Sequence, residues 1–257
     1  MVMRYTEGIK LLVYKKLFKK IDSQLAKANS LRGALFRLQA VLNDRACAHI
    51  AYTFLLHRNS YIRGDEVSGT TMPDSVTKYY WKNGGTNTDP VVELIPKITE
   101  PVLMDLQEYF TNKDTIYYNN PYLGGIIENQ WHEMMIYPVM PDDGTGGYCA
   151  LTFLGVPEAQ PYSEQFYLDL GHHFHSAIRK HGFLKQYFKI TEKEKAVLEG
   201  MAVGKTTADI ASELGLKQRA IELRLQNARK KLRARTTTEA VYKAAAYSII
   251  FGGKNTD

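Results

Sequence analysis

The last quarter of the sequence carries closely spaced helix start and stop signals. Thr191 and Glu194 have the spacing of a capping box, in which both side chains bond free amide groups at a helix N-terminus. Thr206 and Asp209 repeat this arrangement, and Gly215 follows as a helix stop. Signals this close together leave room only for short helices. We therefore predict a small all-helical domain of four helices, the last of them beginning near Thr236.

The second and third of these helices have the proportions of a helix-turn-helix, with a short turn at Gly215-Leu216. At about 100° per residue, the third helix has one apolar stripe and one mixed polar face. The stripe consists of Ile221, Leu225, Ala228 and Leu232. The mixed face consists of Arg219, Glu222, Leu223, Gln226, Lys230 and Arg233. Such a mixture suits the major groove of DNA, where Arg, Gln, Glu and Leu each have a matching base edge. The alternative is a solvated helix face.

Charge is distributed unevenly along the chain. The sequence has 33 Lys and Arg and 27 Asp and Glu, a net charge of +6. Residues 189–257 hold 14 basic and 8 acidic residues, which leaves 19 of each for residues 1–188. The whole excess therefore lies in the helical segment. This favours a nucleic acid partner, with a solvated basic surface as the alternative.

The stretch 190–232 resembles the LuxR-type DNA-binding domain. Glu194, Leu198, Gly204, the Ile210-Ala211 pair and the stretch 227–232 match that family in residue type and spacing. Three positions depart from it: Lys217 replaces the usual serine, Ala220 the usual threonine, and Arg224 a frequent histidine.

The resemblance implies phosphate contacts for Lys217, Gln218 and Arg219, and base contacts for Glu222 and Gln226. Glu222 would serve specificity or pair with Arg219 or Arg229. The full set of predicted DNA contacts is Lys217, Gln218, Arg219, Glu222, Leu223, Gln226, Arg229 and Lys230.

The fourth predicted helix has small and apolar residues along one side, namely Val241, Ala244, Ala245, Ser248 and Ile249. The resemblance implies that this helix pairs with its symmetry mate. A homodimer would present two recognition helices to a near-palindromic operator in double-stranded DNA. RNA polymerase is a further candidate partner. The alternative for this stripe is packing within its own domain.

The preceding residues predict a separate domain. We expect helices over 3–43, from Pro73, from Asp89-Pro90, around 101–111 and from Ser163 to about 183. We expect strands over 46–57, 132–139 and 148–154, the last two joined by a turn at 142–147. The fold class is α+β, with an α/β/α sandwich around an antiparallel sheet and a four-helix helix-turn-helix domain. The predicted boundaries are 1–183 for a sensing or dimerisation domain, 184–190 for a linker and 191–257 for the DNA-binding domain.

Other sequence features limit the classes of function that are expected. No apolar run is long enough for a transmembrane helix, and the N-terminus lacks the pattern of a secretory signal. The two cysteines, Cys47 and Cys149, are expected to be core thiols of a cytoplasmic protein without membrane contact. No phosphate-loop, HExxH or GxSxG motif is present, and we predict no catalytic residue and no cofactor. His172, His173 and His175 lie together, but no further ligand indicates a metal site.

Residues 79–92 resemble the signal pocket of quorum-sensing LuxR-type regulators, which bind acyl-homoserine lactones. The resemblance implies that Tyr80 bonds the acyl carbonyl, that Asp89 accepts from the ligand amide and that Thr152 is a further polar contact. The predicted ligand-binding set is Tyr80, Trp81, Asp89, Tyr137 and Thr152. Val76 stands where a tryptophan is usual and Gly85 where an aromatic residue is usual. These departures predict a different small ligand or none.

Three alternatives apply to single residues: Asp89 as a helix cap only, and Tyr80 and Trp131 as core aromatics only. The leading hypothesis is a dimeric DNA-binding transcription regulator that senses a small molecule, either an acyl-homoserine lactone or another signal. The second is a ligand-independent regulator or antagonist, whose N-terminal domain only dimerises. The third is an enzyme that uses the histidine-bearing helix.

Overall fold

The structure, a computed structural model, describes residues 2–42, 47–57, 66–115, 117–140, 147–155 and 161–251, with side chains from residue 14 onward except that of Thr86. The chain divides into two compact units, Met1–Ala177 and Ile178–Asp257. Each unit is described by itself.

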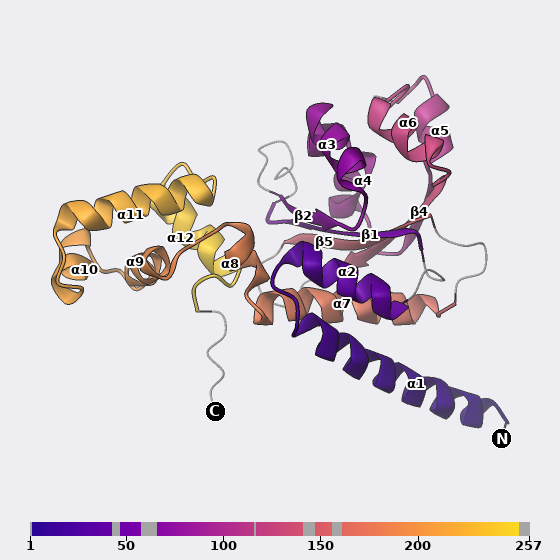
Figure 1. Cartoon of the computed structure of the whole chain (residues 1–257), viewed down its shortest axis with the longest axis horizontal. Helices are drawn as coiled ribbons and strands as arrows, with labels where there is room; N and C mark the ends of the chain where they lie inside the picture. Colours follow the sequence, from indigo (N-terminus) through magenta and orange to yellow (C-terminus); the bar gives the residue numbers. More distant parts are fainter. Residues whose placement is uncertain are drawn as a thin grey trace. The chain divides into compact units, whose positions relative to one another are not determined.

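The N-terminal unit is built on a five-stranded sheet with the strand order β2-β1-β5-β4-β3, in which all neighbours are antiparallel. The strands are β1 (His49–Leu55), β2 (Val67–Thr70), β3 (Val102–Asp105), β4 (Glu133–Val139) and β5 (Tyr148–Leu154). Three helices cover one face: α1 (Val2–Leu25), α2 (Leu31–Leu42) and α7 (Glu164–Lys180) (Figure 1). The other face carries α3 (Asp74–Lys82), α4 (Pro90–Leu94), α5 (Leu106–Thr111) and α6 (Pro121–Glu128), with short 3-10 turns at Gly85–Thr88 and Ile95–Lys97 (Figure 1). The predicted α/β/α sandwich around an antiparallel sheet is confirmed.

Strand alternation divides the core between these two faces. On β1, the ring of Tyr52 packs edge-on against Phe174 of α7, with ring centroids 5.6 Å apart. On β4, Tyr137 stacks on Tyr167 of α7 at 4.9 Å. The intervening residues face α3, α4 and α6, and they include Ile136, which is fully buried.

Two predicted helices differ from the structure. The segment 3–43 is two helices, because Ser30 begins a new one: its hydroxyl accepts from the Gly33 amide at 3.1 Å. The segment 101–111 begins as strand β3, which pairs with β4, and turns helical only after Asp105. The Asp105 carboxylate caps α5 by accepting from the Gln107 amide at 2.8 Å. Strand β2 and helix α6 have no counterpart in the sequence prediction. The predicted turn at 142–147 falls largely on 141–146, outside the described residues.

The C-terminal unit contains α8 (Phe183–Tyr187), α9 (Glu192–Ala202), α10 (Thr207–Glu213), α11 (Gln218–Lys231) and α12 (Thr237–Ala246) (Figure 1). Both predicted capping boxes form, at Thr191 and at Thr206. The predicted linker 184–190 instead holds most of α8. Its Phe188 is buried and packs on Tyr247 at 4.7 Å, so this segment joins the core of the C-terminal unit.

Within the described ranges, every helix is too short or too polar to cross a membrane.

Candidate functional site

The turn between α10 and α11 fixes the geometry of the helix-turn-helix. Gly215 takes a φ of 63°, the left-handed conformation that ends α10. The Leu216 amide then donates to the Ala211 carbonyl at 2.9 Å. Across the turn, the Gln218 side-chain amide donates to the Thr207 hydroxyl at 3.1 Å. The first turn of α11 is therefore held against α10.

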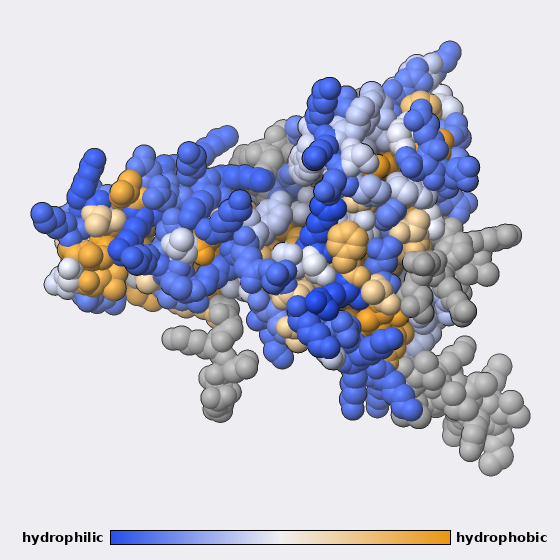
Figure 2. Space-filling model, in the orientation of Figure 1, coloured by the Kyte–Doolittle hydropathy of each residue, from blue (hydrophilic) through white to orange (hydrophobic). Residues whose placement is uncertain are grey.

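Helix α11 separates its faces as its sequence predicts. Ile221, Leu225, Ala228 and Leu232 are buried. On the opposite side, Leu223 is 56% exposed and the Arg219 side chain 92%. Gln226 and Lys230 are also exposed, and so is Asn227, which was not among the predicted contacts. The surface over these C-terminal helices is mostly hydrophilic, with an apolar patch at the end where α10 lies (Figure 2). DNA contact by the exposed residues stays a prediction.

Glu222 lies on the exposed face among potential DNA-contacting groups. Its carboxylate accepts from the Gln218 side-chain amide at 3.1 Å and lies 3.9 Å from the Arg219 guanidinium. The predicted pairing with Arg219 is thus present, although it is long and exposed. The neighbours moderate the repulsion that a bare carboxylate would exert on phosphate groups.

Arg229 has a different place from the predicted one. It is half-buried, and its guanidinium donates to the Arg235 carbonyl. The side chain therefore holds the segment after α11 instead of projecting from the exposed face with Lys230. Sequence spacing alone could not separate these two neighbouring cations.

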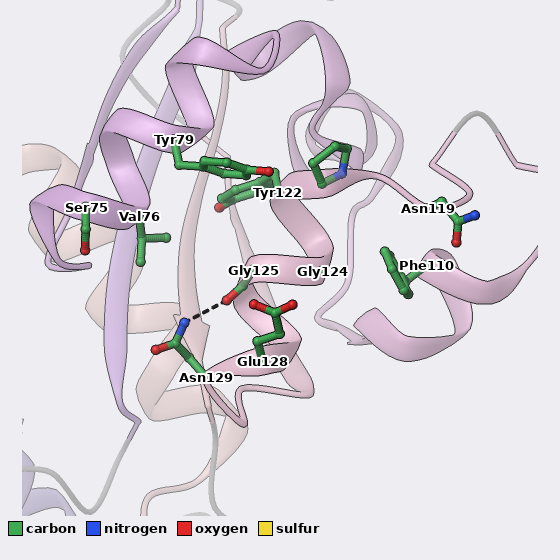
Figure 3. A pocket seen from close by; sticks show the side chains of 11 residues that line it. Ser75, Val76, Tyr79, Phe110, Asn119, Tyr122, Gly124, Gly125, Glu128 and Asn129 are labelled. Carbon is green, nitrogen blue, oxygen red and sulfur yellow. Dashed lines mark hydrogen bonds between the residues drawn. The ribbon is translucent and has the colours of Figure 1, made fainter.

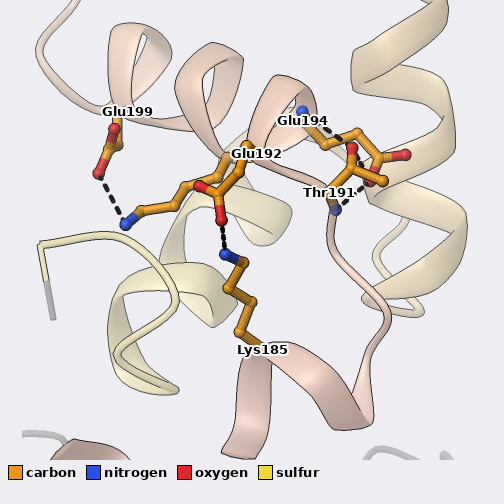
Figure 4. A network of polar contacts seen from close by, with 6 residues as sticks. Lys185, Thr191, Glu192, Glu194 and Glu199 are labelled. Carbon is orange, nitrogen blue, oxygen red and sulfur yellow. Dashed lines mark hydrogen bonds and ion pairs between the residues drawn. The ribbon is translucent and has the colours of Figure 1, made fainter. Parts of the chain in front are cut away.

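A polar network centred on the buried Glu194 joins α11 to the start of α9. The Glu194 carboxylate accepts from the Thr191 amide at 2.8 Å and from the Lys231 ammonium at 2.7 Å. Burial acts to raise the pKa of Glu194, but the bonds from Lys231 and Thr191 outweigh it and hold the pKa below its ordinary value. Nearby, Lys185 of α8 pairs with Glu192 of α9, as Figure 4 shows.

The stripe predicted on the fourth helix is divided between core and surface. Ala244 and Ile249 are buried, so they are unavailable to a symmetry mate. Val241, Tyr242 and Ala245 reach the surface, and Tyr242 is 41% exposed. Helix α12 ends at Ala246, before the last two residues of the predicted stripe.

In the N-terminal unit, the structure brings Tyr80 and Asp89 into direct contact. The Tyr80 hydroxyl donates to Asp89 Oδ2 at 3.0 Å, while Asp89 Oδ1 accepts from the Val91 amide at 2.9 Å. Asp89 is therefore both the predicted N-cap of α4 and the partner of Tyr80. Burial raises the pKa of Asp89 to about 6, although the bonds from Val91 and Tyr80 act to lower it.

Two small cavities between the sheet and helices α3, α4 and α6 meet at Asp89. The larger, ≈ 110 Å³, is lined by Tyr80, Trp81 and Asp89. The smaller, ≈ 40 Å³, reaches Thr152 on β5 and shares Asp89 with the first. Four of the five predicted ligand contacts therefore line adjoining cavities.

Tyr137, the fifth predicted contact, lies elsewhere. It faces α7 on the other side of the sheet, where burial raises its pKa to about 12. Met134, on the same strand, lines the smaller cavity instead. Trp131 is partly buried and packs edge-on against His49 at 4.4 Å.

Several residues that line the cavities were not predicted from the sequence. Thr53 and Thr70 are on β1 and β2, and Tyr122 is in the first turn of α6. The alternation of Thr53 with the aromatic residues Tyr52 and Phe54 would have indicated a polar position on the cavity side. Nothing in the sequence indicated Tyr122, because helix α6 itself was not predicted.

The histidines of α7 have separate neighbours. His173 lies 2.6 Å from Asp22 of α1, and His175 Nδ1 lies 2.7 Å from the Tyr52 hydroxyl. Burial lowers the pKa of His175 to about 4. Within the part of the chain that the structure describes, no three potential ligands gather around a metal-sized space.

The fold and these sites define a helix-turn-helix domain joined to an α/β/α domain. Residues 189–244 match the model of the bacterial regulatory proteins of the luxR family. This segment therefore belongs to the LuxR family of DNA-binding regulatory domains, and the resemblance stated from its sequence is confirmed.

Comparison with solved structures shows the fold of the whole chain. SdiA of Escherichia coli has a TM-score of 0.51 at 16% identity, covering 93% of this chain and 99% of SdiA. SdiA in complex with octanoyl-rac-glycerol has a TM-score of 0.45 at 16% identity, covering 96% of this chain and 95% of that one. CepR2 of Burkholderia cenocepacia, an N-acylhomoserine lactone-dependent LuxR family factor, has a TM-score of 0.46 at 15% identity, covering 68% and 97%. A search of curated protein sequences found no match.

Proposed function

We propose that this chain is a transcription regulator that binds double-stranded DNA as a homodimer and senses a small molecule through its N-terminal domain. The exposed face of α11 is the observation that carries this proposal. It combines Arg219, Leu223, Gln226 and Lys230 opposite a fully buried stripe. Cations, an amide and an apolar group on one helix face match phosphate, base-edge and thymine-methyl contacts in a major groove.

The surface of α12 supports the homodimer. Val241, Tyr242 and Ala245 recur at helical spacing and are at least partly exposed. A two-fold axis beside this apolar stripe would place two copies of α11 on one side of the dimer. That arrangement suits a near-palindromic operator.

The adjoining cavities support small-molecule sensing. They combine apolar walls with the convergent polar groups of Tyr80, Asp89 and Thr152, the composition of a site that orients a ligand. A buried carboxyl with a raised pKa is also typical of functional sites. The ligand class is a small amphipathic molecule with a hydrogen-bonding head group.

The size of the cavities favours a second candidate, in which the N-terminal domain dimerises without a ligand. Volumes of ≈ 110 and ≈ 40 Å³ are well below the roughly 300–1,000 Å³ of ordinary ligand sites. Tyr80 and Asp89 also satisfy each other in the absence of any ligand.

DNA binding is tested with two single substitutions on α11 and random-sequence selection. Lys217→Ala should weaken binding to all sequences and reduce the slope of log affinity against log salt by about one. Gln226→Ala should instead change the preferred sequence, at a cost of about 1–3 kcal/mol for the original site. An unchanged preference at equal affinity would show that α11 does not read bases through Gln226.

Ligand sensing is tested by mass spectrometry of small molecules released from the denatured, purified chain. A sensor should release a stoichiometric compound, and that compound should stabilise the empty chain by about 2.7 kcal/mol at 100 times its Kd. A chain that is well folded, dimeric and free of any bound compound would favour the ligand-independent candidate.

A further inference from the structure

A larger groove lies outside the polar cavities, between α3 and α6. It has a volume of ≈ 550 Å³, and Phe110 of α5 is among the residues that line it (Figure 3). Tyr122 lines both this groove and the smaller cavities, so its ring forms the wall between them. None of the predicted site residues Tyr80, Asp89 and Thr152 lines the groove.

The floor of the groove is a helical glycine without a packing reason. Apart from its chain neighbours and the backbone of its own helix, a Cβ at Gly125 would meet no described atom within 4 Å, whereas one at Gly124 would lie 3.2 Å from the Phe110 ring. Glycine inside a helix costs about 1 kcal/mol relative to alanine. Packing against Phe110 accounts for Gly124. Gly125 keeps the floor of the groove open, and α6 is less stable by about that amount than it would be with alanine there.

The walls are aromatic and the charge is negative. Tyr79, Tyr122 and Phe110 line the groove, and Figure 3 shows the Glu128 carboxylate beside the two glycines. Among the described residues that line the groove, Glu128 is the charged one. The Gly125 carbonyl already accepts from the Asn129 side chain at 2.7 Å, which leaves Glu128 as the strong acceptor.

Aromatic rings together with a carboxylate are the groups that recognise organic ammonium ions. Ring faces attract the cation through their quadrupole, and the carboxylate adds a Coulomb term. We propose that this groove binds an organic ammonium cation with an apolar body. An anionic or neutral lipid tail fits less well, because Glu128 repels the first and gains nothing from the second. This proposal stands independently of the function proposed for the polar cavities.

The test is a titration of the full chain with choline, followed by NMR of the isotope-labelled protein. Its carbon isostere, 3,3-dimethylbutan-1-ol, has the same shape without the charge. Choline should shift the resonances of α3 and α6, and the isostere should bind at least about fivefold more weakly. Equal binding of the two, or shifts confined to other elements, would overturn the proposal.

Three variants locate the site. Gly125→Leu should abolish choline binding, because its side chain fills the floor. The same change should not unfold α6, because leucine favours helices more than glycine does. Glu128→Gln should raise the Kd about fivefold, whereas Glu133→Gln, an exposed control on β4, should leave it unchanged. Undiminished binding to Gly125→Leu would place choline elsewhere and refute the assignment.

Discussion

The Lys231 ammonium lies 2.7 Å from the Glu194 carboxylate and so ties the end of α11 to the start of α9. Glu194 is 6% exposed at its side chain and also closes the capping box of Thr191. One carboxylate therefore satisfies a helix terminus and a cation from another helix.

Removing the Lys231 ammonium should destabilise the C-terminal unit, because the Glu194 carboxylate would stay buried without its cation. Lys231→Ala leaves the Glu194 charge with only the Thr191 bonds, and we expect the C-terminal unit to lose about 2 kcal/mol. Amide hydrogen exchange in α9 and α11 measures the loss locally. Lys230→Ala is the matched control because its side chain is exposed: stability should be almost unchanged while DNA affinity falls. Equal exchange rates in both variants would contradict this account.

Asp89 should make the N-terminal unit more stable in mild acid. Because its pKa rises from 3.8 to about 6 on folding, the folded state binds the proton more tightly than the unfolded state does. The contribution is complete below about pH 4 and is lost as the pH rises through about 6, a change of up to about 3 kcal/mol.

Asp89→Asn imitates the protonated form and isolates this contribution. The variant should equal the parent near pH 4 and exceed it in stability at pH 7. Urea unfolding followed by tryptophan fluorescence reports on this unit, since Trp81 and Trp131 both lie in it. A stability difference that does not vary with pH would show that Asp89 is ionised with an ordinary pKa.

Substituting Lys217 by serine should raise the stability of the C-terminal unit and lower its affinity for DNA. Lys217 occupies the N-cap of α11 without a side-chain cap bond. Lys217→Ser supplies a capping hydroxyl and should stabilise the C-terminal unit by about 1 kcal/mol. The same change removes a cation that we predict to contact phosphate, so DNA affinity should fall, as predicted for Lys217→Ala. The prediction fails if serine and alanine give equal stability in thermal unfolding.

The hydroxyls of Tyr80 and Tyr137 lie on opposite faces of the sheet, so their removal should affect ligand affinity differently. Tyr80→Phe removes the donor to Asp89 and should alter the affinity for any compound recovered with the chain. Tyr137→Phe removes a hydroxyl on the α7 face and should leave that affinity unchanged. Calorimetric titration of both variants measures this, and an equal loss for Tyr137→Phe would argue for a ligand that spans the sheet.

Helix α11 could be predicted in detail because its signals are local. The cap at Thr206 and the left-handed stop at Gly215 bound α10, so α11 begins just after that stop, and the helical repeat then determines its faces. The exception is Arg229, whose bond to the Arg235 carbonyl depends on how the chain folds back after α11.

The cavities beside Asp89 were harder to predict, because they depend on contacts between segments that are far apart in the sequence. Edge strands β2 and β3 have only four residues each and lack a clear alternating pattern. Tyr137 was misassigned because a shift of one residue moves a strand side chain to the other face. The family resemblance of residues 79–92 predicted that Tyr80 and Asp89 lie at a cavity, but the cavity's volume depends on Tyr122, from a helix that was not predicted.

The small volume beside Asp89 has a consequence for the dose at which a sensor of this kind would respond. A ligand larger than the cavity binds only a widened form of the domain, so the apparent Kd is the intrinsic Kd divided by the fraction of widened protein. At a fraction of about 1%, the response shifts to roughly a hundredfold higher concentration. Trimming a wall residue such as Met72 would lower that concentration without touching the polar contacts. Sensitivity would then be a property of the unliganded protein as much as of the signal.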